Sequence, residues 1–283
     1  MAMLLGLALL FALDVSPSTM GRPVPPFHIA GNLYYVGHNE ISAFLFATPQ
    51  GLILIDGGFE ASAPQILSNV QQLGFKPEDV KILLNTQAHF DHAGALAELK
   101  RATGAKLVAL QADAQELANG GPDDGTPRIP PVDTDVVVKD GGQVELGGTT
   151  LIAHLTPGHT KGCTTFTTSI EGKSAVFVCS TTAPGYKLVG NAAYPNIVDN
   201  FRSTFNILRE LPCDYFFASH GSFFDLDRKR RRLIGAKHGG ASGGGANPFI
   251  DPSGYQAFLT KTETAFERQL AQQKQVSKDP EKR

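Results

Sequence analysis

The sequence predicts a mixed fold, of the α/β or α+β class, in which β-strands alternate with α-helices. Short apolar runs of strand length recur in both halves of the chain, and apolar residues at helical spacing separate many of them. The 283 residues are 42% hydrophobic and 18% charged, which allows a large core and excludes disorder of the whole chain. Two sheets faced by helices are one layered arrangement that buries such elements.

The first half of the chain contains several apolar runs bounded by turn residues. They predict strands at residues 33–35, 42–47, 52–56, 80–84 and 106–110. Apolar residues recur at helical spacing from Ile66 to Leu73, and Gly74 follows as a typical helix end. Two more helices are expected at residues 93–102 and 111–119.

The second half begins with a loop rich in Gly, Pro and Asp at residues 120–131. Strands are expected at residues 136–138, 143–146, 149–154, 163–169, 175–179 and 215–218. Glu171 and Gly172 are predicted to form a hairpin turn between two of them. One helix carries Phe201 and Leu211 on its apolar face, and the chain ends in a helix at residues 255–275. The Gly-rich loop at residues 239–245 has no phosphate-binding pattern.

Residues 4–13 are apolar, and no charge occurs before Asp14. This run is shorter than the roughly 20 residues of a membrane span, and its length suits the apolar region of a signal peptide. No Lys or Arg precedes it and no A-x-A site follows, so the alternative is an apolar element of the folded domain. We expect residues 1–20 to be a leader, residues 21–283 to form one domain, and the protein to be periplasmic or secreted. No later segment is apolar enough for stable membrane insertion.

The charge of the chain is nearly balanced, with 25 Lys+Arg against 27 Asp+Glu and a formal net charge of −2. This balance argues against a nucleic-acid partner, because nucleic-acid binders carry a basic excess or stripe. The basic run from Arg228 to Arg232 would spread around a helix and is interpreted as a solvated face. Binding of an anion or a nucleic acid is the alternative for that run.

The strongest chemical signal is QAHFDH at residues 87–92, between a predicted strand and a predicted helix. Loops of this kind project functional groups into a cleft. His89, His92 and Asp91 offer imidazole and carboxylate donors that suit zinc. His159 and His220 also lie just beyond predicted strand ends, each beside a glycine. One such histidine alone is usually structural, but three strand ends that each present histidines favour a metal site. His154 lies on a predicted strand and is at best a neighbour of that site.

With these residues, the chain resembles the metallo-β-lactamase superfamily, whose H-x-H-x-D-H motif is QAHFDH here. The segments FHIAGNLYYVG, GLILIDGG, PGHTKGC, APGYKLVGN and LPCD resemble subclass B3 of the metallo-β-lactamases. The resemblance covers the chain after the leader. It implies a four-layer αββα sandwich with a zinc cleft at one edge of the sheets. Fold alone does not establish β-lactam hydrolysis, because many hydrolases share it.

The resemblance also implies roles for individual residues and up to two Zn²⁺ per chain. Gln87, His89 and His159 match the ligands of the first zinc, and Asp91, His92 and His220 match those of the second. Gln87 replaces the usual histidine, as it does in some B3 enzymes. An amide oxygen is a weaker zinc donor than imidazole, so we expect the first site to bind zinc more weakly than the second.

The implied reaction is attack of zinc-activated hydroxide on the lactam amide of a small-molecule β-lactam, with Asp91 orienting the hydroxide. Ser180 and Thr182 match positions that bind the lactam carboxylate; purely local hydrogen bonding is the alternative for Ser180. Tyr186 and Asn191 either border the cleft or hold the shape of their own loop. The sequence has no G-x-S-x-G or S-x-x-K pattern that would supply a side-chain nucleophile.

The 3 Cys of the chain lack C-x-x-C spacing, which argues against a structural zinc knuckle. A turn at Glu171-Gly172 places Cys163 opposite Ser180, one residue from Cys179. B3 relatives have a disulfide here, so the resemblance implies a Cys163–Cys179 bridge. Cys213 is expected to be a buried free thiol, because the C-terminal helix offers no partner.

The expected function is therefore that of a monomeric, zinc-dependent β-lactamase of subclass B3. Two alternatives remain. The first is another hydrolase of the same fold, a lactonase or thioesterase. Many of these use a bridging Asp after the third histidine, whereas no Asp occurs between Ala153 and Val198. The second is a zinc-binding protein in which Gln87 has weakened catalysis.

Overall fold

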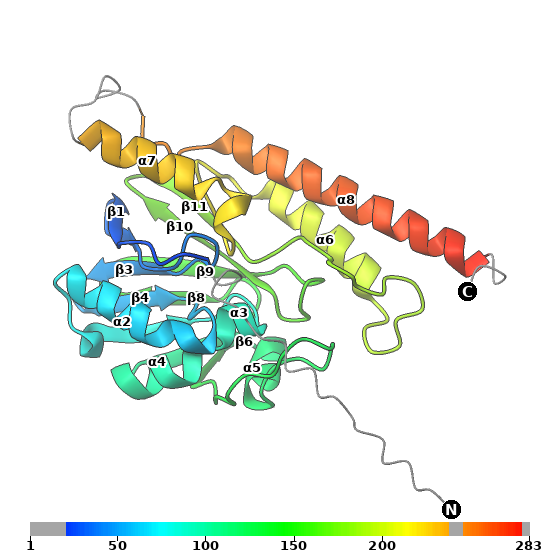
Figure 1. Cartoon of the computed structure of the whole chain (residues 1–283), viewed down its shortest axis with the longest axis horizontal. Helices are drawn as coiled ribbons and strands as arrows, with labels where there is room; N and C mark the ends of the chain where they lie inside the picture. Colours follow the sequence, from blue (N-terminus) through cyan, green and yellow to red (C-terminus); the bar gives the residue numbers. More distant parts are fainter. Residues whose placement is uncertain (1–20, 238–245, 279–283) are drawn as a thin grey trace, which may run out of the picture.

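The computed structural model describes residues 21–237 and 246–278, which form two β-sheets between two layers of helices (Figure 1). This arrangement confirms the four-layer αββα sandwich. The expected leader at residues 1–20 and the Gly-rich loop at residues 239–245 lie outside the described residues.

The first sheet has seven strands in chain order. They are β1 (Phe27–Ala30), β2 (Leu33–Tyr35), β3 (Phe44–Thr48), β4 (Gly51–Ile55), β5 (Val80–Leu84), β6 (Lys106–Leu110) and β7 (Val136–Val138). β1 to β4 pair antiparallel, whereas β4 to β7 are parallel. The parallel strands therefore end at the same edge of the sheet. The sequence interpretation missed β1, which is short and follows a run of prolines.

The second sheet has five strands in the order β12-β11-β10-β9-β8. They are β8 (Gln143–Leu146), β9 (Thr149–Leu155), β10 (Thr164–Ile170), β11 (Lys173–Val178) and β12 (Tyr215–Ala218). Ile170 pairs with Lys173 across the predicted hairpin turn. Glu171 and Gly172 have φ angles of 52° and 75°, the positive values of a two-residue type I′ turn.

Helices cover the outer face of each sheet (Figure 1). On the first sheet lie α2 (Ala63–Gln72), α3 (Phe90–Ala93), α4 (Leu96–Thr103) and α5 (Gln111–Ala118); on the second lie α6 (Ile197–Glu210), α7 (Leu226–Lys237) and α8 (Pro252–Lys278). Short 3-10 turns occupy η1 (Glu60–Ser62), η2 (Pro77–Asp79) and η3 (Gly221–Phe223). Among the described residues, no helix has the length and apolar character needed to cross a bilayer.

The expected helix at residues 93–102 begins later, at Leu96 in α4, and residues 90–93 form a separate short helix, α3, with Gly94 between the two. A Cβ at Gly94 would lie 2.5 Å from the backbone nitrogen of Glu60. The backbone of η1 therefore packs directly on Gly94. The strict helical spacing of the apolar residues could not reveal this close approach.

Aromatic side chains fill the space between the sheets. Phe44 from the first sheet meets Phe177 and Phe217 from the second, with ring centroids 5.0 and 5.2 Å apart. Such large rings carry much of the energy of core packing. The packed sheets form the support from whose edge the site residues project.

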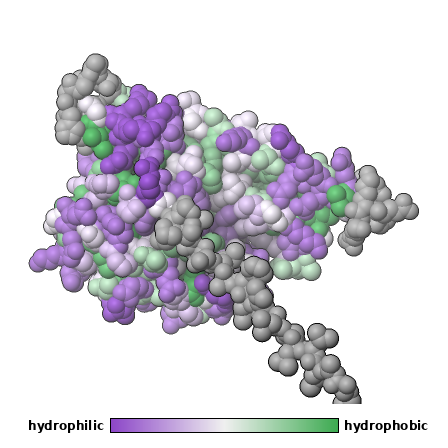
Figure 2. Space-filling view, in the orientation of Figure 1, coloured by the Kyte–Doolittle hydropathy of each residue, from purple (hydrophilic) through white to green (hydrophobic). Residues whose placement is uncertain are grey.

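The basic run was interpreted as a solvated face, and this is wrong for Lys229. Its side chain is only 3% exposed, and its Nζ lies 2.9 Å from Asp251 Oδ2. The ammonium group also lies 5.4 Å from the centre of the Phe216 ring. Arg228, Arg231 and Arg232 are exposed. Figure 2 shows a hydrophilic surface over α7.

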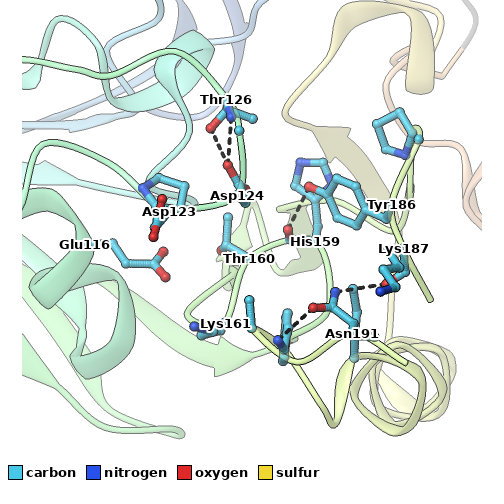
Figure 3. A pocket seen from close by; sticks show the side chains of 17 residues that line it. Glu116, Asp123, Asp124, Thr126, His159, Thr160, Lys161, Tyr186, Lys187 and Asn191 are labelled. Atoms are coloured by element: carbon cyan, nitrogen blue, oxygen red, sulfur yellow. Dashed lines mark hydrogen bonds between the residues drawn. The ribbon is translucent and has the colours of Figure 1, made fainter. Parts of the chain in front are cut away.

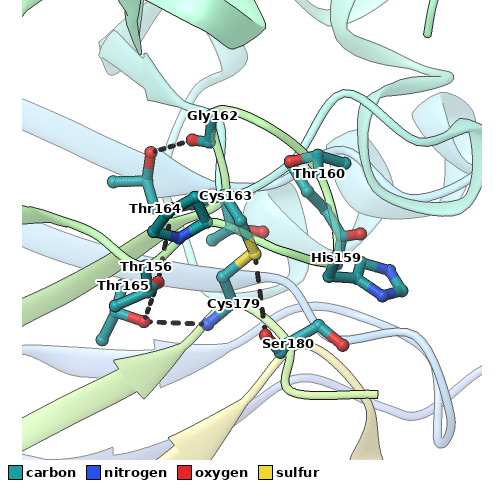
Figure 4. Close-up of a disulfide and its surroundings, with 12 residues drawn as sticks. Thr156, His159, Thr160, Gly162, Cys163, Thr164, Thr165, Cys179 and Ser180 are labelled. Atoms are coloured by element: carbon teal, nitrogen blue, oxygen red, sulfur yellow. Dashed lines mark hydrogen bonds between the residues drawn. A yellow bond between two sulfur atoms is a disulfide. The ribbon is translucent and has the colours of Figure 1, made fainter. Parts of the chain in front are cut away.

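Cys163 and Cys179 form a disulfide, with Cα atoms 5.9 Å apart (Figure 4). Cys163 precedes β10 and Cys179 follows β11, so the bridge ties together the ends of the hairpin. Cys213 is free but half-buried, whereas it was expected to be buried. Its Sγ donates to the carbonyl of Tyr215 at 3.4 Å, and burial raises the pKa of the thiol to about 12.

Candidate metal centre

The expected ligands come from loops that follow three strands in the two sheets. Residues 85–89 connect β5 to α3, His159 follows β9, and His220 follows β12. His89 is the residue before α3, while Asp91 and His92 lie within that helix. Because of this short helix, His89 faces His159, whereas Asp91 and His92 face His220.

Gln87, His89 and His159 form the first group of donors. Gln87 Oε1 lies 3.0 Å from His89 Nδ1, which lies 3.1 Å from His159 Nε2. Gln87 and His89 are buried. Three donor atoms from two loops thus converge on one region, as the ligand assignment requires.

Asp91, His92 and His220 form the second group. The Nε2 atoms of His92 and His220 lie 3.3 Å apart. Asp91 Oδ2 lies 3.3 Å from His92 Nε2 and 3.5 Å from His220 Nε2. One donor atom from each residue lies within 4.8 Å of the others, a spacing that a single metal ion can bridge.

Each of the four imidazoles has an oxygen partner at its other ring nitrogen. The contacts are His89 Nε2 to Asp124 Oδ2 at 2.9 Å, His159 Nδ1 to the Thr182 carbonyl at 2.8 Å, His220 Nδ1 to Glu40 Oε1 at 3.4 Å, and His92 Nδ1 to Asp56 Oδ2 at 3.5 Å. The hydrogen bonds of His89 and His159 hold the proton on the far nitrogen and direct the other lone pair at a metal. The carboxylates beside His220 and His92 are longer ion-pair contacts, and His92 Nδ1 makes no hydrogen bond. The sequence interpretation missed Asp124, Glu40 and Asp56, because nothing local to them indicates the contact.

The charge balance in the second group favours cation binding. Burial alone would lower the pKa of His92, but the carboxylates of Asp91 and Asp56 raise it to about 10. Burial would raise the pKa of Asp91, yet the neighbouring imidazoles hold it well below its usual range. In the first group, burial and the nearby His89 lower the pKa of His159 to about 3, so this ring is a neutral donor.

The donor chemistry of both groups fits zinc, which binds imidazole nitrogen together with oxygen ligands. Gln87 is fully buried, and its Nε2 has no hydrogen-bond partner, whereas its Oε1 points into the first group. Gln87 therefore offers its oxygen to that group. The residues present suit one zinc in each group.

A cavity of about 600 Å³ opens beside His159, between the loop at residues 122–126 and residues 184–197 (Figure 3). Tyr186 lines it, and its hydroxyl donates to the His159 carbonyl at 2.9 Å. Asn191 also lines it, and its side chain bonds the backbone of Lys187 and Tyr194. Both residues therefore border the cavity and also shape their loop.

The two residues expected to contact the substrate, Ser180 and Thr182, are buried and half-buried. Ser180 is 2% exposed, and its Oγ lies 3.2 Å from Thr182 Oγ1. Thr182 is half-buried, and its carbonyl accepts from His159. Neither side chain lines the cavity, so contact with a lactam carboxylate stays a prediction. His154 bonds Thr167 at 2.8 Å within the second sheet and not the metal groups.

Comparison with known proteins finds matches to one superfamily and to solved structures of β-lactamases. The model of the metallo-beta-lactamase superfamily matches residues 36–220. The structure of the FEZ-1 metallo-beta-lactamase from Legionella gormanii is 41% identical, with a TM-score of 0.83, over 90% of this chain and 98% of that one. BJP-1, a subclass B3 metallo-beta-lactamase of Bradyrhizobium japonicum, is 36% identical, with a TM-score of 0.83, over 91% of this chain and 97% of that one.

A curated relative points to a different activity over a shorter stretch. The hydroxyacylglutathione hydrolase of Rhodospirillum rubrum is 32% identical over 100 residues, which are 35% of this chain and 32% of the relative. The match therefore spans about a third of that relative's length.

Proposed function

The chain belongs to the metallo-β-lactamase superfamily, and from this premise we propose that it is a zinc-dependent β-lactamase of subclass B3. The observation that carries the proposal is the convergence of two triplets of donor atoms, one of which includes His159 at the wall of the cavity. The likeness to the two β-lactamase structures extends over nearly their whole length, at 36–41% identity.

We propose that Gln87, His89 and His159 hold the first zinc, and that Asp91, His92 and His220 hold the second. Bound zinc lowers the pKa of water to about 7 and polarises a carbonyl group, which is the chemistry that amide hydrolysis needs. Asp91 is ionised at neutral pH and half-buried, within 3.5 Å of His92 and His220, where its carboxylate would orient the attacking hydroxide. The oxygen partners of the imidazoles hold the ligands in place while the amide is cleaved.

The substrate we propose is a small-molecule β-lactam in the cavity beside His159. Ser180 and Thr182, which do not line the cavity in this structure, remain the predicted partners for its carboxylate. Lys161 and Lys187 line the same cavity, beside the carboxyl groups of Glu116, Asp123 and Asp124, and offer cationic partners to an anionic substrate. The thioesterase alternative rests on the curated relative, which matches over a much shorter stretch. Residue 180 is also Ser here, where many such hydrolases have a bridging Asp.

We also propose that residues 1–20 are removed on export and that residues 21–283 act as a monomeric domain in the periplasm or the medium. The buried Cys163–Cys179 disulfide supports an oxidising compartment. N-terminal sequencing of protein recovered from the periplasm tests the cleavage, and gel filtration tests the oligomeric state.

The decisive experiment measures ring opening of a chromogenic cephalosporin and a carbapenem by absorbance. The protein is loaded with zinc, stripped with a chelator, and reloaded. We expect turnover that is lost with the metal and recovered with it. A glutathione thioester assayed in parallel is the control. Hydrolysis of the thioester alone would support the thioesterase, and zinc binding without turnover of either would support the zinc-binding protein.

A further inference from the structure

Asp124 reaches the first donor group from a loop outside both sheets. Its Oδ2 lies 2.9 Å from Nε2 of His89, whose side chain is only 4% exposed. Its Oδ1 accepts from the Thr126 backbone nitrogen at 3.0 Å and from Thr126 Oγ1 at 2.6 Å (Figure 3). One carboxylate oxygen is thus held by the loop, and the other is directed at the imidazole.

This contact determines which nitrogen of His89 faces the metal. When Nε2–H donates to Asp124, Nδ1 carries the lone pair, and Nδ1 is the atom next to Gln87 Oε1 and His159 Nε2. A carboxylate behind an imidazole also makes it a stronger metal donor.

The two donor groups differ in charge. Asp91 gives the second group an anionic ligand, whereas Gln87, His89 and His159 are all neutral donors. Asp124 supplies a negative charge beside the first group, through its contact with His89 Nε2. The residue that it contacts, His89, lies next to Gln87, and the amide of Gln87 is the weakest donor of the three.

We propose that Asp124 is a positioning residue for the first metal, which orients His89 and offsets part of the affinity lost at Gln87. The proposal rests on the proposed function in that both groups are taken to bind zinc. Asp124 and Thr126 also line the cavity. The loop that borders the substrate cavity is therefore tied directly to a metal ligand.

Two substitutions weaken this contact to different extents. Asp124→Asn removes the charge and leaves one acceptor oxygen, which can accept from His89 or from Thr126 but not from both, whereas Asp124→Ala removes both acceptors. Zinc affinities are measured by competition with a chromophoric chelator, and stoichiometry by elemental analysis. We expect the affinity for the weaker zinc to fall about tenfold in Asp124→Asn and up to about 100-fold in Asp124→Ala, with the tighter zinc unchanged.

The matched control is Asp123→Asn, which removes the adjacent loop carboxylate and should leave both zinc affinities unchanged. A second readout is the Nε2–H resonance of His89 in ¹⁵N-labelled, zinc-loaded protein. It should shift in Asp124→Asn and exchange faster with solvent in Asp124→Ala. Wild-type affinities and an unchanged resonance in both variants would overturn the proposal. Failure of the wild type to bind a zinc at the first group would instead count against the proposed function.

Discussion

His92 Nε2 lies 3.3 Å from His220 Nε2, although the two residues are 128 positions apart. His92 lies in α3, against the first sheet, and His220 follows β12 of the second sheet. Asp91 contacts both rings. The second metal group therefore exists only when the two sheets are packed together.

Replacement of His220 by alanine tests this group. Asp91 and His92 would remain, but two protein ligands hold zinc poorly. We expect His220→Ala to bind about one zinc rather than two and to lose at least about 100-fold in β-lactam turnover. Elemental analysis after dialysis and steady-state assays measure these effects. Unchanged zinc content would show that His220 is not a ligand.

Replacement of Gln87 by histidine tests the first group. An imidazole is a better zinc donor than an amide oxygen, and it would also remove the unpartnered buried Nε2. We expect Gln87→His to tighten the first zinc at least about tenfold, or about 1.4 kcal/mol. Chelator competition measures it, with Gln87→Ala as the matched loss of donor. Two equally tight zincs in the unmodified protein would contradict the weaker first site.

Asp113 in α5 is buried and holds the loop that carries His159. Its Oδ1 accepts from the Gly162 backbone nitrogen at 3.0 Å, and its Oδ2 accepts from Asn85 Nδ2 at 3.3 Å. Burial and the nearby carboxylate of Glu116 raise its pKa from 3.8 to about 8. In the folded protein this carboxyl therefore keeps its proton over a range where the unfolded chain has lost it.

The sign of the resulting pH dependence follows from this difference. The contribution of Asp113 to the free energy of unfolding is fully present below about pH 4. It declines as the pH rises toward 8, by at most about 1.4 kcal/mol per pH unit. Asp113→Asn cannot ionise. We expect the difference in free energy of unfolding, variant minus wild type, to increase from about pH 5 to about pH 8. Urea titration at each pH measures it. A difference that stays constant over this range would contradict the raised pKa.

The Cys163–Cys179 disulfide closes a loop of 16 positions. A cross-link of this length contributes about 3 kcal/mol by restricting the unfolded chain. We expect the double variant Cys163→Ser, Cys179→Ser to lose about this free energy of unfolding. Cys213→Ser, which removes the free thiol, is the control and should change stability much less. A reducing agent should destabilise wild type and Cys213→Ser but not the double variant.

Much of the fold could be predicted because its signals are local. Apolar runs such as Val80–Leu84 and the Glu171-Gly172 turn depend on neighbours in the chain, and the structure has strands and a turn there. The division of the helix near Gly94 could not be predicted, because it depends on contact with η1. Lys229 was misjudged for the same reason, since its partner Asp251 comes from another segment.

The sequence by itself determined which residue types stand at three strand ends, and hence the chemistry that can occur there. The histidines, Asp91 and Gln87 carry that chemistry in their own atoms. Only the tertiary structure decided which donors share a metal group and which oxygens hold them. Asp124, Asp56 and Glu40 lie 35, 36 and 180 positions from the imidazoles they contact. Such pairings arise from the packing of the two sheets, for which no local pattern in the chain exists.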